Sequence, residues 1–282
     1  HVARSPLRPE AGAPHATSLV GPSRRMMRIL LLLLALSPAV AQKLIWHDEF
    51  NGRAGSAPDR TRWNYDAGAG KWGNYELETY TDSAGNAFLD GNGHLVIRVL
   101  KTADGYTSAR LKTEGKFEFT YGKVEARLRL PQGQGIWPAF WMLPLDRSLR
   151  WPNAGEIDIM ENIGREPGIV HATVHGPGYS GDKGITSTYQ LDKPDAFHIY
   201  TVEWRRDSIE FQVDRAVIHK ATPANLPAGA RWVFTSPFFL LLNVAVGGTW
   251  PGNPDATTTF PQTMVVDWVR VYRLRDYGPQ RK

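Results

Sequence analysis

The sequence predicts an all-β protein, built as a sandwich or barrel of antiparallel strands. From residue 43 on, apolar and polar residues alternate in short segments, and 27 Gly and 20 Pro interrupt the 282-residue chain at short intervals. In the same region, no segment keeps the helical period of 3.6 over ten or more residues. Many short alternating strands with Gly and Pro between them are typical of antiparallel sandwiches and barrels.

Five segments carry most of this prediction. Residues 94–100 are a short apolar run, and apolar and charged residues alternate from Val124 to Leu130 within residues 115–130. Residues 197–220 are expected to form a hairpin or two consecutive strands, with "RRDS" at the turn. Residues 238–248 are apolar throughout and predict a strand buried on both faces, and residues 263–274 predict a last alternating strand.

The N-terminal region is set aside before the fold is considered. Residues 26–41 contain a basic Arg28, an apolar core and Ala39-Val40-Ala41, which together indicate a secretory signal peptide cleaved near Ala41. The apolar core is too short to span a membrane. Residues 1–25 are expected to be a disordered upstream segment, residues 42–276 one domain, and residues 277–282 a tail. The mature protein is therefore expected to be periplasmic or extracellular and free of the membrane.

Charge and cysteine content exclude several classes of protein. Residues 1–41 hold five Arg and one Glu, so they account for four of the five net positive charges. The mature chain then carries about one positive charge and no basic stripe, which argues against nucleic acid as a partner. There is no cysteine, which excludes disulfides, thiolate metal sites and cysteine nucleophiles.

The segment "WPNAGEIDIMENIG" at residues 151–164 places three carboxylates in an apolar run. Glu156 and Asp158 are two residues apart, so a strand directs both to one face. Glu161 is five residues from Glu156, and strict alternation would send it to the other face. A β-bulge around Ile159–Met160 would return Glu161 to the face of the other two, and such bulges occur beside active sites.

Carboxylates grouped in this way suit glycoside hydrolysis, which uses one protonated and one ionised carboxyl group. Mutual repulsion separates the pKa values of neighbouring carboxyls and so distinguishes an acid from a nucleophile. A solvent-exposed strand face is the simpler explanation for a single carboxylate, and a calcium site is an alternative for a cluster. Calcium loops, however, are turns rich in Asp, Asn and Gly, whereas this segment is apolar and strand-like.

Aromatic residues near this segment are candidates for contact with sugar rings, whose apolar faces stack on aromatic side chains. Trp137, Trp141 and Trp151 precede the carboxylates, and Trp250 lies in the loop "GGTWPG", where it closes one end of the site or simply packs. His171 and His175 are four residues apart, but without H-E-x-x-H and outside a helix they do not predict a zinc site.

Several segments, in this order along the chain, resemble glycoside hydrolase family 16, and the bacterial laminarinase (endo-β-1,3-glucanase) branch in particular. The resemblance covers almost all of residues 43–275. Its segments read "IWHDEFNG", "WGNYELETYT", "GQGIWPAFWMLP", "GEIDIMEN", "HATVHGPGYSG", "LLNVAVGGTWPG" and "VDWVRVYR".

The resemblance implies a β-jelly-roll sandwich of two antiparallel sheets with a concave substrate cleft. It also implies retaining chemistry, with Glu156 as the nucleophile and Glu161 as the general acid/base. Asp158 would hydrogen-bond to the nucleophile and modulate its ionisation. The E-x-D-x-x-E form of the family contains a bulge, and its lichenase-like E-x-D-x-E form does not, in agreement with the parity of this sequence.

The resemblance also assigns substrate contacts. Asn74, Arg110 and His175 match positions that contact the substrate, as do the three tryptophans before the carboxylates. The usual "NNEL" reads "NYEL" here, so Tyr75 departs from the family at that end of the cleft.

Many family members carry a structural calcium ion away from catalysis. The matching positions are Glu49 and Gly93, through their backbone, and Asp267. A salt bridge from Asp267 to a Lys or Arg is an equal alternative, because a carboxylate in an apolar strand needs a partner. No cofactor is expected to be required for catalysis.

The sequence thus predicts a secreted, retaining endo-β-1,3-glucanase, expected to be a monomer whose partner is a β-glucan such as laminarin. Cleavage of mixed-linkage β-1,3-1,4-glucan on the same fold is the first alternative. A galactan substrate is disfavoured by the Trp-rich segments. A non-catalytic β-glucan-binding protein is a further alternative, but relatives of that kind lack the two glutamates that this chain has.

Overall fold

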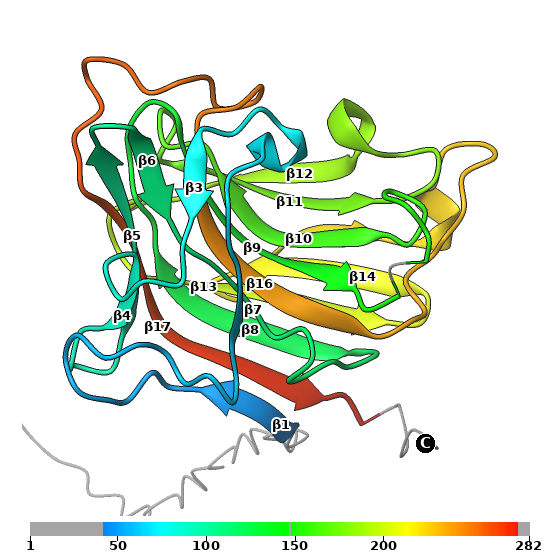
Figure 1. Cartoon of the computed structure of the whole chain (residues 1–282). Coiled ribbons are helices and arrows are strands. Elements are labelled where there is room, and N and C mark those ends of the chain that lie inside the picture. The colour runs from blue at the N-terminus through cyan, green and yellow to red at the C-terminus, as the bar shows by residue number, and fades with distance from the viewer. Residues whose placement is uncertain (1–41, 147, 276–282) are drawn as a thin grey trace, which may run out of the picture. The chain divides into compact units, whose positions relative to one another are not determined.

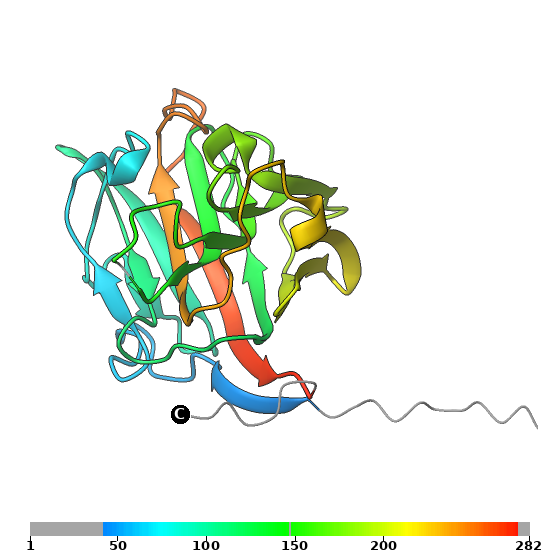
Figure 2. The same ribbon diagram turned by 90° about the vertical axis from the view of Figure 1, so that its right-hand side faces the viewer.

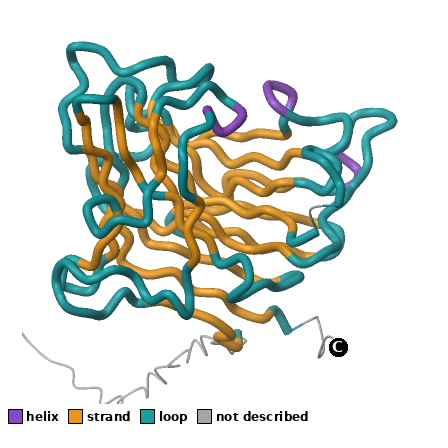
Figure 3. Tube along the Cα trace, in the orientation of Figure 1, coloured by secondary structure: helices purple, strands orange, loops and turns teal. Residues whose placement is uncertain are grey.

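The computed structural model describes residues 42–146 and 148–275, which form two β-sheets packed face to face (Figure 1). The predicted signal peptide, the upstream segment and the C-terminal tail lie outside the described residues. Within them, helical structure is limited to three short 3-10 turns, and strands dominate the trace (Figure 3). These turns are η1 (Lys71–Gly73), η2 (Gly181–Lys183) and η3 (Pro223–Asn225). No helix in this part of the chain has the length and apolar character needed to cross a membrane.

One sheet has seven strands, and it carries the carboxylate segment near its middle. Its strands run in the order β12-β11-β10-β9-β16-β7-β2. Their bounds are β2 Asn64–Asp66, β7 Arg110–Lys112, β9 Ile136–Pro144, β10 Glu156–Asn162, β11 Ile169–His175, β12 Ile185–Gln190 and β16 Phe238–Val246.

The second sheet has ten strands, and eight of them follow the order β15-β14-β13-β8-β17-β5-β6-β3. The other two, β1 and β4, pair with β17 and β5. The bounds are β1 Lys43–Asp48, β3 Glu78–Tyr80, β4 Ala87–Leu89, β5 Leu95–Thr102, β6 Gly105–Ser108, β8 Gly122–Arg129, β13 His198–Arg205, β14 Ser208–Val213, β15 Ala216–Ala221 and β17 Gln262–Arg273.

The sandwich of two sheets confirms the predicted class, with three differences in detail. β3 and β6 pair in parallel, whereas the sequence predicted antiparallel sheets only. Residues 197–220 form three strands and not two, because Asp214 and Arg215 make a second tight turn with positive φ. Only residues 122–129 of the segment 115–130 are a strand; the earlier part makes a single bridge, between Phe119 and Phe238.

The core lies between the sheets and follows the predicted alternation. Val124, Ala126 and Leu128 of β8 are fully buried. Every residue of β16 is buried, as its continuous apolar sequence predicted. Figure 2 shows β16 (orange) and β17 (red) running through the centre of the two sheets. β9, which pairs with β16, and β10, which pairs with β9, are therefore held on a rigid apolar layer.

Candidate functional site

The predicted bulge is present in β10. Asp158 lies opposite Trp141 on β9 and Thr173 on β11, and Glu161 lies opposite Ala139 and His171. Two residues of β10, Ile159 and Met160, therefore span a distance that each neighbouring strand covers with one. Both are buried in the core. The bulge thus lets the two apolar side chains face inward while Glu156 and Glu161 stay partly exposed on the outer face of the sheet.

All three carboxyl groups have raised pKa values. Burial and the nearby charge of Asp158 raise the pKa of Glu156 to about 8, and burial raises that of Asp158 to about 7. The pKa of Glu161 lies well above its ordinary value, because burial and the charges of Asp158 and Glu156 add together. The three carboxyl groups therefore titrate as a coupled set in which at least one proton is retained near neutral pH.

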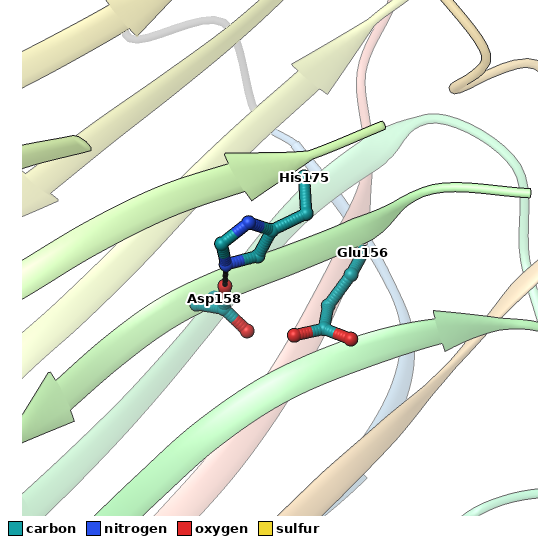
Figure 4. A group of neighbouring side chains, drawn as sticks. All are labelled: Glu156, Asp158 and His175. Carbon is teal, nitrogen blue, oxygen red and sulfur yellow. Dashed lines mark ion pairs between the residues drawn. The ribbon is translucent and has the colours of Figure 1, made fainter. Parts of the chain in front are cut away.

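Asp158 lies between a carboxyl group and an imidazole. Its carboxylate interacts with Glu156 through a shared hydrogen bond, which lowers the pKa of Asp158 and raises that of Glu156. Nε2 of His175 lies 3.2 Å from Oδ2 of Asp158. Figure 4 shows the three side chains pointing toward one another, two from β10 and one from β11. The electrostatic interaction with His175 lowers the pKa of Glu156.

A tight contact fixes the ring of His175. Gly184 precedes β12, and a Cβ atom at that position would lie 2.5 Å from Cε1 of His175.

Possible ligand atoms of Glu156, Asp158 and His175 also lie within 4.8 Å of one another, a spacing that a metal ion could bridge. Along β11, His171 lies opposite Glu161 and His175 lies opposite Glu156, so the structure does not group them as a pair of zinc ligands.

Two predicted tryptophans donate hydrogen bonds to the two catalytic candidates. Nε1 of Trp151 donates to Oε2 of Glu156 at 2.9 Å, and Nε1 of Trp137 donates to Oε1 of Glu161 at 3.0 Å. Trp151 is 54% exposed and its ring lies 5.9 Å from that of His175. A donor to a carboxylate favours the ionised form, so each indole lowers the pKa of its partner.

Trp250 lies at the Glu161 end of the site. Its ring makes edge contacts with Trp137 at 5.3 Å and with His171 at 4.9 Å between centroids. Two hydrogen bonds hold the loop that carries Trp250. Arg165 donates to the carbonyl oxygen of Pro251, and Gln134 donates to the same atom at 2.9 Å. Trp250 thus packs against Trp137, whose indole contacts Glu161, and its closing one end of the site stays a prediction.

The remaining predicted substrate residues come together at the other side of β9. The guanidinium of Arg110 lies 4.7 Å from the ring centroid of Trp141 and 5.2 Å from that of Trp72. Asn74 follows η1 and donates to Oε1 of Glu76 at 2.9 Å. Tyr75, the departure from the family pattern, is 65% exposed and has a left-handed backbone, with φ of 61°.

Sequence reasoning missed several residues behind this group. Glu76, Tyr80 and Asn243 are buried and hydrogen-bonded beneath it. The sequence held two signals. Asn243 is the one polar residue in the apolar run of β16, and Glu76, Glu78 and Tyr80 alternate in "ELETY" as one strand face would. A polar residue in a buried strand needs a partner, which could have pointed to a network.

The predicted calcium positions fit an ion only in part. A Cβ atom added to Gly93 would lie 3.9 Å from the carbonyl oxygen of Glu49, so these two backbone positions are neighbours. The carboxylate of Asp267, however, lies 2.5 Å from Nη1 of Arg127, and that of Glu49 is paired with Arg270. The salt bridge that the sequence offered as an alternative for Asp267 is present.

Comparison with known proteins adds to this geometry. Residues 75–270 match the model of a family described as glycosyl hydrolases family 16. A β-glucanase of Rhodothermus marinus is 42% identical over 249 residues, which cover 82% of this chain and 85% of that protein.

Two solved structures share the fold. The laminarinase catalytic domain from Thermotoga maritima MSB8 is 47% identical, with a TM-score of 0.77 over 82% of this chain and 98% of that one. The endo-β-1,3-glucanase from Pyrococcus furiosus is 49% identical, with a TM-score of 0.76 over 82% and 94% of the two chains. The predicted jelly-roll sandwich is confirmed by these likenesses.

Proposed function

The chain belongs to glycosyl hydrolase family 16, and we propose on this basis that it is an endo-β-1,3-glucanase that hydrolyses laminarin-like β-glucans with retention of configuration. The site supplies the two carboxyl groups that this reaction uses.

The bulge in β10 is the observation that carries the proposal. It places Glu156 and Glu161 on the outer face of one strand with Asp158 between them. Burial and mutual repulsion raise the pKa of both glutamates, which lets the site hold a proton. The interaction with His175 and the donor from Trp151 both favour an ionised Glu156. The arrangement therefore provides an acid and a nucleophile at fixed positions.

The reaction follows in two steps. A carboxylate oxygen of Glu156 forms a bond to the anomeric carbon while the glycosidic C–O bond breaks, and Glu161 gives its proton to the leaving oxygen. Glu161, now ionised, then removes a proton from a water molecule, whose oxygen attacks the same carbon and releases Glu156. Asp158 shares a hydrogen bond with Glu156 and holds it in place when its charge changes.

Two substitutions test the assignment. Glu156→Gln and Glu161→Gln keep the shape of each side chain but remove the nucleophile or the acid, so each is expected to lower the release of reducing sugar from laminarin by roughly three orders of magnitude or more. Thermal unfolding should show that both variants are folded. Near-normal turnover in either variant would refute the assignment.

Chemical rescue tells the two roles apart. With an activated β-glucoside substrate, azide should rescue Glu156→Ala by attacking directly, which gives an α-glycosyl azide. It should rescue Glu161→Ala by attacking the glycosyl-enzyme, which gives a β-glycosyl azide. The products are identified by NMR, and reversed products would exchange the two roles.

A panel of polysaccharides tests the substrate. We expect the highest kcat/KM on β-1,3-glucan, with some cleavage of mixed-linkage β-1,3-1,4-glucan. Activity confined to mixed-linkage glucan or to a galactan would replace the proposed substrate. Binding of laminarin without release of sugar would favour the non-catalytic alternative.

We further propose that catalysis needs no metal or other cofactor, since protein groups supply both the acid and the nucleophile. We propose that the mature protein is a monomer located outside the cytoplasm, with no nucleic acid as partner. The predicted signal peptide supports the location, and the small net charge of residues 42–282 supports the absence of nucleic acid. Light scattering of the purified protein and N-terminal sequencing of the exported form test these points.

A further inference from the structure

Two buried carboxyl groups that the proposed reaction does not use lie side by side at the edge of the site. Glu76 is 7% exposed and Glu78, the first residue of β3, is 1% exposed. Oε2 of Glu78 accepts a hydrogen bond from the backbone N–H of Val246 at 2.7 Å, and the carboxyl groups of Glu78 and Glu76 interact through a side-chain hydrogen bond that raises the pKa of Glu78 and lowers that of Glu76. Two ionised carboxylates in such a place would repel each other strongly.

The pair therefore holds a proton. Burial raises the pKa of Glu78 to about 8, and the charge of Glu76 adds to this rise. Burial also raises the pKa of Glu76, but hydrogen bonds from its neighbours and the charge of Arg110 oppose that rise. Of the two groups, Glu78 is the one whose contacts favour the protonated form, whereas the contacts of Glu76 favour its ionised form.

The carboxylate of Glu76 is the centre of a hydrogen-bond network. Its Oε1 accepts from Asn74, and its Oε2 lies 3.4 Å from the hydroxyl group of Tyr80, which donates to it. That hydroxyl group accepts from Nδ2 of Asn243 at 3.1 Å. Oδ1 of Asn243 in turn accepts from Nε1 of Trp141 at 2.7 Å. The network therefore links Asn74 to Trp141, which are two of the residues expected to contact sugar.

Arg110 completes the group. It stacks on the rings of Trp72 and Trp141, and its charge acts on Glu76. Glu76 and Glu78 act on each other electrostatically. The other charged or titratable groups that interact with the pair are Tyr80 of β3 and Arg110 of β7. Asp66 of β2 is ion-paired with Arg110, its Oδ2 lying 3.1 Å from Nε.

We propose that Glu76 and Glu78 share one proton and act as positioning residues, which hold Asn74, Arg110 and Trp141 in the geometry that binds β-glucan. When Glu78 loses that proton at alkaline pH, the second buried charge disrupts the network and glucan binding weakens. This inference rests on the proposed function, because it takes β-glucan as the ligand of these side chains. Neither glutamate touches the reacting atoms.

Binding of laminarihexaose to an inactive protein provides the test. Glu156→Gln removes turnover, so calorimetry can measure the dissociation constant from pH 6 to pH 9. Glu78→Gln is added in a second protein, since an amide stays neutral at every pH and keeps the shape of the protonated acid. At pH 6 the two proteins should bind within about twofold of each other; at pH 9 the protein that retains Glu78 should bind about tenfold more weakly.

Glu203→Gln on β13 is the matched control, since it makes the same substitution on a strand that four other strands separate from β3 in the ten-stranded sheet. It should leave the pH dependence of the Glu156→Gln protein unchanged. If Glu78→Gln gives the same pH dependence as this control, the inference is overturned, whatever the activity of the wild-type protein. A wild-type protein that releases no sugar from any β-glucan would instead overturn the proposed function.

A second variant tests the network itself. In the otherwise wild-type enzyme, Glu76→Gln removes the charge that Asn74 and Tyr80 contact, so it should raise KM for laminarin about tenfold while kcat changes less than about threefold. Glu76→Asp should fail to restore KM, because its carboxylate is one methylene too short to reach both partners. A normal KM in Glu76→Gln, or an equal loss in kcat, would contradict a positioning role.

Discussion

Trp137 and Trp151 each form a hydrogen bond with a different glutamate of the site. Each donates one indole N–H, Trp151 to Glu156 and Trp137 to Glu161. A tryptophan side chain near a carbohydrate site commonly provides a flat apolar surface on which sugar rings stack. Here the same side chains also influence which proton leaves first, because a donor to a carboxylate favours its ionised form.

Replacing each indole by a ring without a donor separates these effects. Trp151→Phe should raise the pKa of Glu156 and so move the acid limb of the kcat/KM profile to higher pH. Trp137→Phe should raise the pKa of Glu161, so that the acid keeps its proton longer and the alkaline limb moves to higher pH. Each shift should be about half a pH unit, the size expected of one hydrogen bond.

Profiles of kcat/KM on a soluble β-1,3-glucan measure both limbs. The two variants serve as controls for each other, because each should move one limb more than the other. The limbs belong to a coupled group of carboxyls, so the direction of each shift is the result that decides. A downward shift in either variant would contradict the assigned donor.

The bulge in strand β10 sets the directions of several side chains at once. It buries Ile159 and Met160 together and keeps Glu161 on the outer face. β11 then presents His175 opposite Glu156, and the turn before β12 leaves room for its ring because residue 184 is glycine. The position of His175 thus depends on packing between neighbouring segments as well as on its own strand.

Gly184→Ala tests this packing. The added methyl group would lie 2.5 Å from Cε1 and 2.7 Å from Nδ1 of His175, so the ring has to leave its present position beside Asp158 and Glu156. We expect kcat/KM to fall about tenfold while the protein stays folded. Gly85→Ala is the control, because its nearest atom is the flexible hydroxyl oxygen of Ser83, and it should leave kcat/KM unchanged. Equal kcat/KM values in the two variants would show that the position of the His175 ring does not affect catalysis.

At the scale of the whole molecule, two sheets enclose one apolar core, and five acidic side chains near the site are buried or partly buried. Glu156, Asp158, Glu161, Glu76 and Glu78 all have raised pKa values, with burial as the first cause. Such groups favour the folded state when they are protonated. Their contribution to stability is complete below the ordinary carboxyl pKa and is lost as the pH rises through the raised values.

The pH dependence of unfolding follows from this sign. For Glu78 the contribution is lost as the pH rises from about 4.5 toward its raised pKa of about 8. The midpoint of thermal unfolding should therefore fall between pH 6 and pH 9, and it should fall less in Glu78→Gln, which has no proton to lose. Calorimetry at constant ionic strength measures both proteins; parallel curves would contradict the predicted linkage.

Calcium provides a last prediction at this scale. The positions Glu49, Gly93 and Asp267 lie away from β10 in sequence, and Asp267 is paired with Arg127. Chelation by EDTA should therefore leave kcat/KM unchanged. If an ion does bind at these positions, calcium should raise the unfolding midpoint without any change in activity. Loss of turnover on chelation that calcium restores would contradict a purely structural role.

Periodicity in the sequence was enough for the fold class and for the bulge. The parity of Glu156, Asp158 and Glu161 allows only an irregular strand if the three act together, and the register of β10 confirms it. Apolar alternation likewise predicted the buried face of β8 and the fully buried β16. These features depend on neighbours in the chain, which a sequence displays directly.

Contacts between distant segments were decided only by the tertiary structure. Asn243 meets Tyr80 across 163 positions of the chain, and Val246 meets Glu78 across 168. The partner of Asp267, the parallel pairing of β3 with β6 and the buried pair Glu76–Glu78 have the same origin. Spacing along the chain reports which side chains share a face. Which side chains of other strands lie opposite them depends on how the whole chain packs to bury its apolar surface.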